Sequence, residues 1–197
     1  MSTIHNSMVA HTLEELHELA MADPKKQEFS NNALRYMAVS LEEGRFLNLI
    51  ARIGKYKNIV EFGCSFGIST IYLAAAAKDN SGKVITSEME ISKAAVARKN
   101  LEKAGLSELV EIREGDAIKT LSDIDKPVDL LFLDGAKDLY FPIFKMLKPK
   151  LSPGAAIIAD NVDKPETHPL VDYLLQEKEN FTTVILFDGR VLLAYCK

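Results

Sequence analysis

The stretch Ile59-Val-Glu-Phe-Gly-Cys-Ser-Phe-Gly67 decides the fold of this chain. Its apolar start predicts a buried strand, and its two glycines predict a tight turn into a helix, because glycine lets the backbone turn sharply and approach a ligand. Further apolar strands follow it in alternation with helical patterns, which is typical of a parallel sheet covered on both faces. The spacing is not Gly-x-Gly-x-x-Gly, the pattern of pyrophosphate-binding turns, and this counts against a nicotinamide cofactor.

Two apolar runs near the end of the sequence break this alternation. Phe181–Phe187 and Arg190–Tyr195 are separated by Asp188-Gly189, a strong signal for a two-residue hairpin turn. We therefore expect an α/β fold with a mostly parallel seven-stranded sheet and a C-terminal antiparallel hairpin. The other expected strands are Asn58–Phe62, Lys83–Ser87, Val110–Arg113, Asp129–Leu133 and Ala155–Ala159, and the helices between them are Ser69–Ala77, Ile91–Ala104, Ala117–Ser122 and Leu139–Leu147.

The first 57 residues have a different pattern. His11–Met21 and Leu41–Gly54 predict amphipathic helices, joined by a polar stretch around Asp23–Gln27. We expect residues 1–57 to form a helical cap segment of the same domain and residues 58–197 to form the α/β core. The sequence leaves open whether this cap covers the sheet, covers the active site or forms a dimer contact.

Length and composition are those of one soluble domain. The chain has 197 residues, of which 47% are hydrophobic, and this is enough for a full hydrophobic core. A net charge of −4 gives no basic footprint for nucleic acid, and no apolar run approaches the roughly 20 residues that span a bilayer. With two cysteines and no signal-peptide pattern, we expect a cytoplasmic protein that binds neither nucleic acid nor membrane.

Acidic residues follow successive expected strands, at the edge where open α/β sheets bind ligands. Glu88 ends the second strand and could bind both ribose hydroxyls, while Asp116 follows the third and could accept a hydrogen bond from an adenine amino group. Each feature is weak alone, because glycine turns often only connect a strand to a helix and surface glutamates are common. Their order at three successive strand ends predicts a nucleotide-like cofactor.

Two later strands end in hard oxygen ligands. Asp134 lies in Phe132-Leu-Asp-Gly-Ala-Lys-Asp-Leu-Tyr140, and Asp160 and Asn161 lie in Ile158-Ala-Asp-Asn-Val162. Two carboxylates and an amide carbonyl suit Mg²⁺ and leave positions for water and two vicinal acceptor oxygens. Lys137 is a candidate general base, because a nearby cation lowers the pKa of a lysine from its usual value of about 10.4.

Purely structural interpretations of these residues stay open. Asp134 could cap the helix that follows it, and Asp160-Asn161 could form a turn before Pro165.

Together the motifs resemble those of the class I S-adenosylmethionine-dependent methyltransferases. More narrowly, the chain is similar to the cation-dependent O-methyltransferases that include catechol and caffeoyl-CoA O-methyltransferases. The resemblance runs from about Met37 to the C-terminus and implies a Rossmann-like fold. The glycine motif alone is widespread, but its combination with the two acidic motifs is much more specific. The motifs are Met37-Ala-Val-Ser-Leu-Glu-Glu-Gly44, Glu61-x-Gly63-x-x-x-Gly67-x-Ser69, Glu88-Met89, Gly115-Asp116-Ala117, Asp134-x-x-Lys137 and Asp160-Asn161.

The resemblance implies an O-methyltransferase that uses S-adenosylmethionine, a divalent cation (Mg²⁺ first) and a small phenolic, catechol-like acceptor. Relatives are commonly homodimers, so a homodimer is expected. The implied metal ligands are Asp134, Asp160 and Asn161, and the implied base is Lys137. The implied cofactor contacts are Glu61, Gly63, Gly67 and Ser69 at the methionine end, Glu88 at the ribose, Met89, Asp116 and Ala117 around the adenine, and Val39 and Asp134 beside the cofactor.

The chain also departs from this family. The segment from Val162 to Asn180 is short, and Ala136 stands where the animal catechol enzyme has an aromatic residue, so a catecholamine is not the expected acceptor. Two rival functions stay open: a metal-independent or nitrogen-directed methyltransferase, and a non-catalytic module that binds S-adenosylmethionine.

Overall fold

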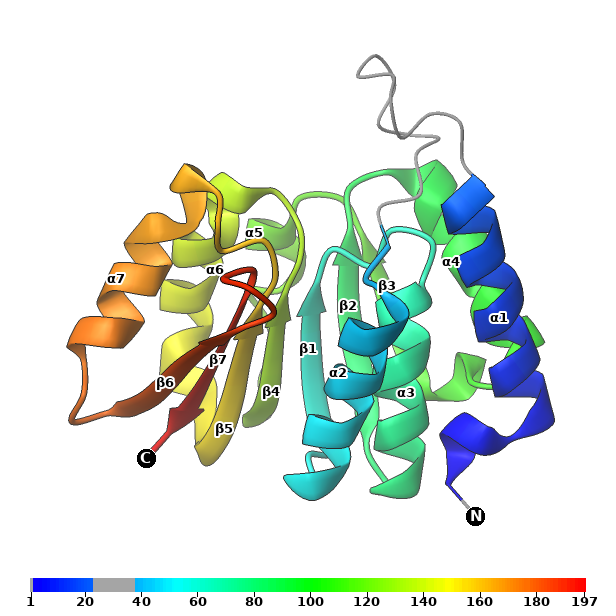
Figure 1. The fold of residues 1–197 in the computed structure, drawn as a ribbon, viewed down its shortest axis with the longest axis horizontal. Helices are drawn as coiled ribbons and strands as arrows, with labels where there is room; N and C mark the ends of the chain where they lie inside the picture. Colours follow the sequence, from blue (N-terminus) through cyan, green and yellow to red (C-terminus); the bar gives the residue numbers. More distant parts are fainter. Residues whose placement is uncertain (1, 23–37) are drawn as a thin grey trace.

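The structure is a computed structural model that describes residues 2–22 and 38–197. In this part of the chain, seven strands form one sheet in the order β3-β2-β1-β4-β5-β7-β6 (Figure 1). Neighbours from β3 to β5 are parallel, while β7 is antiparallel to both β5 and β6. The strands are β1 (Asn58–Phe62), β2 (Lys83–Glu88), β3 (Val110–Glu114), β4 (Val128–Leu133), β5 (Leu151–Ala159), β6 (Phe181–Leu186) and β7 (Val191–Cys196).

The expected sheet with a C-terminal antiparallel hairpin is confirmed, but the hairpin turn differs from the expectation. Leu186 pairs with Val191, so the turn spans Phe187–Arg190 rather than Asp188-Gly189 alone. Phe187, Asp188 and Gly189 all have a positive φ, which gives a wider loop than a two-residue turn. The expected polar connection around Asp23–Gln27, and Met37, lie outside the described residues.

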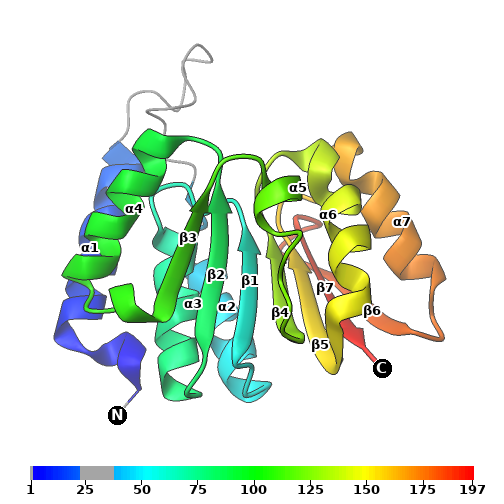
Figure 2. The same ribbon diagram turned by 180° about the vertical axis from the view of Figure 1, so that it is seen from behind.

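Helices cover both faces of the sheet (Figures 1 and 2). The helix at His168–Gln176 was not expected from the sequence, and α5 ends at Thr120, earlier than expected. The helices are α1 (Ser7–Ala22), α2 (Leu41–Ile53), α3 (Ile68–Asp79), α4 (Ile91–Lys103), α5 (Ala117–Thr120), α6 (Tyr140–Leu147) and α7 (His168–Gln176), with 3-10 turns η1 (Thr3–His5), η4 (Ser107–Leu109), η5 (Lys137–Leu139), η6 (Lys148–Lys150) and η7 (Pro165–Thr167).

Two apolar clusters join these layers. On one face, Leu13 of α1 and Leu47 of α2 are buried together with Ile71 of α3 and the strand residue Phe132. On the other face, α6 and α7 are buried against Leu131 and its neighbours on β4 and β5. The helices before β1 therefore share a core with α3. None of the helices in residues 2–22 and 38–197 combines the length and the apolar character needed to cross a membrane.

An irregularity in β5 fixes how its end meets the end of β4. Val128 pairs with Leu151 and Leu130 pairs with Ala156, so β5 carries extra residues over a stretch where β4 advances by only two positions. Gly154 lies in that stretch with φ of 81°. Beyond it the pairing is regular, and the last residue of β4, Leu133, pairs with the last residue of β5, Ala159.

Asp79 connects the first described residues to the end of α3. Its carboxylate accepts hydrogen bonds from the Ser2 hydroxyl at 2.9 Å and from the Thr3 backbone and hydroxyl at 3.0 and 2.6 Å, and it lies 3.1 Å from Nε of Arg52. Burial raises the pKa of this carboxyl, but the hydrogen bonds from Thr3 and Ser2 and the charge of Arg52 outweigh burial. The pKa of Asp79 is therefore lowered.

We predict that Asp79→Asn lowers the free energy of unfolding by about 1–2 kcal/mol at neutral pH, because charge-assisted hydrogen bonds are lost. The folded pKa of Asp79 lies below its unfolded value of about 3.9, so the ionised group stabilises the fold above that pH. This contribution is lost as the pH falls through the folded pKa. Urea titrations of both proteins, with the exposed Asp125→Asn as control, should show the difference shrinking on acidification; a constant difference would contradict the assignment.

Candidate functional site

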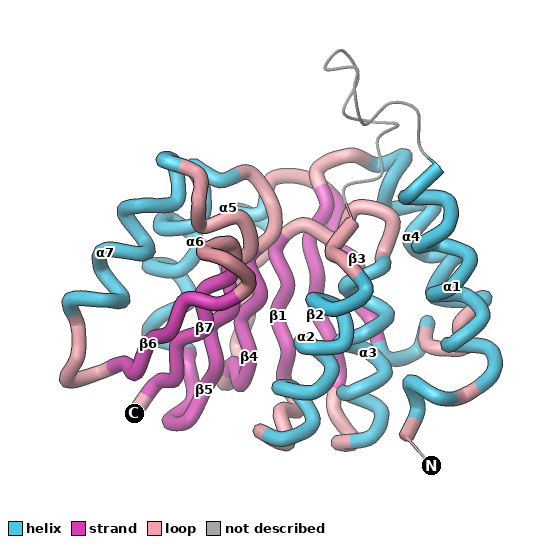
Figure 3. The backbone as a smooth tube through the Cα atoms, viewed as in Figure 1, coloured by secondary structure: helices cyan, strands magenta, loops and turns pink. Residues whose placement is uncertain are grey.

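Loops gather at the carboxyl edge of the parallel strands (Figure 3). The ends of β1, β2, β3 and β4 border a cavity of about 280 Å³ at this edge. Its position is where an open α/β sheet binds ligands. The structure brings six of the expected cofactor residues together around it: Gly63, Glu88, Met89, Asp116, Ala117 and Asp134.

Gly63 is required by a close approach of two loops. Its φ is 93°, and a Cβ atom there would lie 2.8 Å from the carbonyl oxygen of Asp134 and from the backbone nitrogen of Gly135. Gly67, with φ of 88°, caps the start of α3 in a left-handed conformation. The glycine turn therefore holds the loop after β1 against the loop after β4, and brings Asp134 to the cavity wall.

Glu88 is held rigidly at the wall of this cavity. One carboxylate oxygen accepts a hydrogen bond from the Ser65 backbone at 2.7 Å and the other from the Glu90 backbone at 3.0 Å. A carboxylate has about four acceptor positions, so Glu88 can still bind two hydroxyl groups. Asp116 has a structural role as well, because its side chain accepts from the backbone of Ile118 at 2.9 Å and caps α5.

Four expected cofactor residues do not line the main cavity, and Gly67, at the start of α3, is one of them. Val39 and Ser69 border a shallow hollow that shares Ser65 with it. Glu61 is fully buried beneath the turn, where one oxygen accepts from the Thr70 hydroxyl at 2.6 Å. Its other oxygen has no hydrogen-bond partner among the described residues. Burial raises the pKa of Glu61, and the hydrogen bond from Thr70 opposes this effect.

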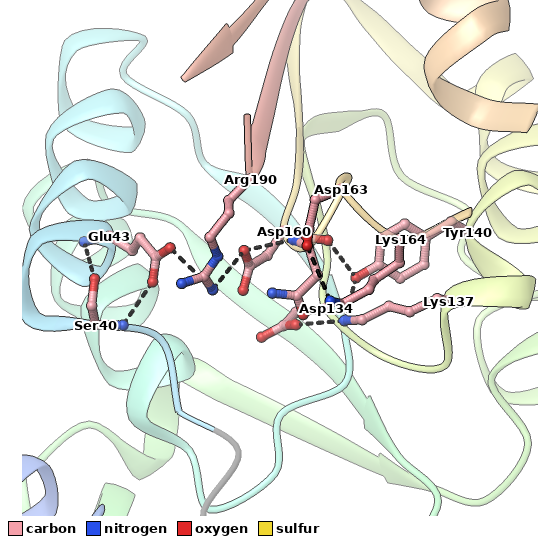
Figure 4. Close-up of polar contacts among 10 residues, drawn as sticks. Ser40, Glu43, Asp134, Lys137, Tyr140, Asp160, Asp163, Lys164 and Arg190 are labelled. Atoms are coloured by element: carbon pink, nitrogen blue, oxygen red, sulfur yellow. Dashed lines mark hydrogen bonds and ion pairs between the residues drawn. The ribbon is translucent and has the colours of Figure 1, made fainter. Parts of the chain in front are cut away.

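A second cluster of polar groups lies where β4 and β5 end (Figure 4). Nζ of Lys137 is 3.0 Å from a carboxylate oxygen of Asp134 and donates to the Tyr140 hydroxyl at 2.8 Å. That hydroxyl in turn donates to the backbone carbonyl of Asp160 at 3.0 Å. Burial raises the pKa of Tyr140, so the phenol keeps the proton that it donates. The candidate base is thus linked to both expected metal-binding loops.

Asp160 is buried and Asp134 is partly buried, and few positive charges lie near them. Burial raises the pKa of Asp134, the charge of Asp160 raises it further, and Lys137 opposes both. Burial and the charge of Glu43 likewise raise the pKa of Asp160. Within residues 2–22 and 38–197, no three His, Cys, Asp or Glu side chains form a metal-binding group. Asp134, Asp160 and the amide of Asn161 are not such a group, because asparagine is not among these four residue types.

Sequence reasoning missed three residues of the site. Tyr140 was quoted only as part of a motif, although its spacing of three residues from Lys137 could have identified the contact. Glu43 forms a capping box with Ser40, a recognisable Ser-x-x-Glu pattern, and its carboxylate also faces Arg190. Arg190 carries no local signal, because only the folded hairpin brings it to the site.

Comparisons with known proteins agree with this fold. The O-methyltransferase family matches residues 7–165. A catechol O-methyltransferase of Niastella koreensis is 39% identical over 146 residues, which cover 68% of this chain and 66% of that protein. A catechol O-methyltransferase of Mycobacterium tuberculosis is 37% identical over 127 residues, 64% of this chain and 57% of that protein. About a third or more of each relative therefore lies outside the match.

A solved structure is similar over nearly the whole chain. The O-methyltransferase from Bacillus cereus in complex with SAH has a TM-score of 0.78 and 28% sequence identity, covering 95% of this chain and 91% of that chain. The O-methyltransferase TomG from Streptomyces achromogenes, in complex with SAM, has a TM-score of 0.76 and 26% identity, covering 94% and 89%.

We predict that Gly63→Ala destabilises the fold more than Gly189→Ala does. Both glycines have similar positive φ values, but a Cβ at Gly189 meets nothing within 4 Å, whereas one at Gly63 meets the backbone of the β4 loop. The left-handed conformation alone costs about 1–2 kcal/mol, and overpacking adds about 1–3 kcal/mol at Gly63. Urea denaturation of both variants measures this difference. Equal losses would show that the two loops can separate without cost.

Proposed function

This chain belongs to the O-methyltransferase family, and we propose that it transfers a methyl group from S-adenosylmethionine to a hydroxyl of a small phenolic, catechol-like acceptor. One observation carries the proposal: a cavity of about 280 Å³ and a pair of aspartates with Lys137 lie at the same sheet edge, and Asp134 belongs to both. The names of the catechol O-methyltransferase relatives and the SAH complex of the Bacillus cereus structure support it.

The cofactor side of the site fits S-adenosylmethionine. Glu88 offers fixed carboxylate oxygens for the ribose hydroxyls, and Met89 and Ala117 supply apolar surface for the adenine. The unpartnered buried oxygen of Glu61 is an acceptor that lacks a donor, and buried polar groups are usually hydrogen-bonded. The ammonium group of the methionine part is a donor of suitable charge. Val39 and Ser69 border the hollow on that side.

The acceptor side fits a divalent cation. Asp134, Asp160 and Asn161 would hold it, because their oxygens are the ligands that Mg²⁺ prefers and the buried carboxylates need a positive charge. When bound, the cation would supply a positive charge that lowers the pKa of the acceptor hydroxyl. As the neutral amine, Lys137 would take the hydroxyl proton, and Asp134 and Tyr140 fix the position of its nitrogen. Transfer then requires only that this oxygen lie in line with the methyl carbon.

We predict that the protein methylates catechol or caffeic acid with S-adenosylmethionine, that EDTA abolishes turnover, and that Mg²⁺ restores it. Methyl transfer measured by chromatography tests this directly. Turnover that EDTA leaves unchanged would favour the metal-independent rival and make Asp160 and Asn161 structural. Cofactor binding without turnover of any phenolic or amine acceptor would favour the non-catalytic rival.

Asp160→Asn and Glu88→Gln should separate the two halves of the site. Because Asp160 is an expected metal ligand, its variant should lose roughly 100-fold or more in turnover, at or above the upper end of the losses seen for residues that orient metal ligands. Because Asp160 lies outside the cofactor cavity, this variant should bind S-adenosylhomocysteine almost as well as the native protein. Glu88→Gln should instead weaken S-adenosylhomocysteine binding by roughly 10-fold or more, because a charged acceptor is lost. Isothermal titration and initial rates measure both. Parallel losses in the two variants would argue against separate cofactor and cation sites.

A further inference from the structure

The tip of the β6–β7 hairpin is anchored beside the acceptor side of the site. The backbone nitrogen of Arg190 donates to Leu186 at 3.1 Å, and its carbonyl accepts from Val162 at 2.8 Å. The ring of Phe187 packs edge-on against Phe46 of α2, with 5.3 Å between ring centroids. The side chain of Arg190 therefore extends from a fixed point on the backbone.

The guanidinium of Arg190 lies between two carboxylates (Figure 4). One terminal nitrogen, Nη2, is 3.5 Å from Glu43 and 3.5 Å from Asp160. The two acidic side chains are only 6% and 7% exposed, whereas the arginine side chain is 48% exposed. Arg190 thus stands on the solvent side of the buried acidic groups, next to an expected metal ligand.

Neither contact uses the full capacity of the guanidinium. Both are long, both come from Nη2, and no described residue hydrogen-bonds Nε or Nη1 of Arg190. Glu43 is already engaged, because its other oxygen accepts from the Ser40 backbone at 2.7 Å in a capping box. The N–H groups of Nε and Nη1 point to different sides of the guanidinium, so they are available to a carboxylate as separate charge-assisted donors rather than as a parallel pair.

We propose that Arg190 binds a carboxylate on the acceptor, so that the enzyme prefers ring-carboxylated vicinal diols over neutral ones. This inference rests on the proposed function, which puts the acceptor hydroxyls at Lys137 and Asp160, directly beside the guanidinium. Glu43, Asp134 and Asp160 would repel an anionic acceptor, and Arg190 supplies the opposing charge on the solvent side. With an acceptor that has no negative group, the N–H groups of Nε and Nη1 of Arg190 hydrogen-bond only to water.

The test compares catechol with 3,4-dihydroxybenzoate, which differs from it by one carboxylate. For the native protein, the KM for 3,4-dihydroxybenzoate should be clearly below that for catechol. Arg190→Leu should raise the KM for 3,4-dihydroxybenzoate about 10- to 100-fold more than it raises the KM for catechol, which is the loss expected for charge-assisted hydrogen bonds. Arg190→Lys should lie in between, because it keeps the charge but not the planar array of N–H donors. Lys126→Leu, an exposed lysine before β4, is the matched control for charge and should change neither value.

Isothermal titration of 3,4-dihydroxybenzoate into the protein with S-adenosylhomocysteine and Mg²⁺ gives a readout independent of turnover, and S-adenosylhomocysteine binding reports that each variant is folded. Equal effects of Arg190→Leu on both acceptors would overturn the proposal and leave Arg190 as a partner of Glu43 and Asp160 only. If the native protein methylates neither compound, the proposed function fails. The titration then still decides the role of Arg190: binding lost in Arg190→Leu supports it, and binding unchanged contradicts it.

Discussion

The site depends on the register between β4 and β5. Leu133 pairs with Ala159, and the backbone nitrogen of Asp160 donates to the carbonyl of Leu133 at 3.0 Å, so the residues that follow both strands leave the sheet side by side. This register brings Asp134 and Asp160 close together, where the negative charge of one carboxylate disfavours ionisation of the other. A slip of one residue would turn the side chains of β5 to the opposite face. The extra residues around Gly154 set the register, and the chemistry of the acceptor side follows from it.

Much of the fold could be predicted because buried parallel strands are continuous apolar runs with turn residues behind them. Asn58–Phe62 is such a strand, and the sequence reading and the structure agree on both its ends. Ser152-Pro153-Gly154 has the composition of a turn, yet it belongs to the irregular first part of β5. Pro169 reads as a helix breaker but is tolerated in the first turn of α7. The placement of β7 between β5 and β6 is a non-local pairing, which no local pattern encodes.

The candidate site likewise contains residues that local motifs predict and residues that only the tertiary structure brings to it. Asp134, Lys137 and Asp160 follow strand ends, so local motifs bring them to one edge as expected. Glu61 lies buried beneath the glycine turn, where the Thr70 hydroxyl binds one oxygen, and its contact with the cofactor stays a prediction. Arg190 comes from a hairpin far along the chain, and its position depends on tertiary packing that a single sequence does not reveal.

The place of β7 has a consequence for how the protein is made. A ribosome delivers the chain from its N-terminus, so residues 38–159 can assemble β1 to β5, together with the cofactor cavity, before β7 has emerged. Until then Ala156–Ala159 form an open strand edge, ready to pair with another chain. The loop after Asp160 also lacks its backbone bond to the hairpin. A nascent or truncated chain could therefore hold cofactor before it can hold an acceptor, and during that interval it is exposed to aggregation.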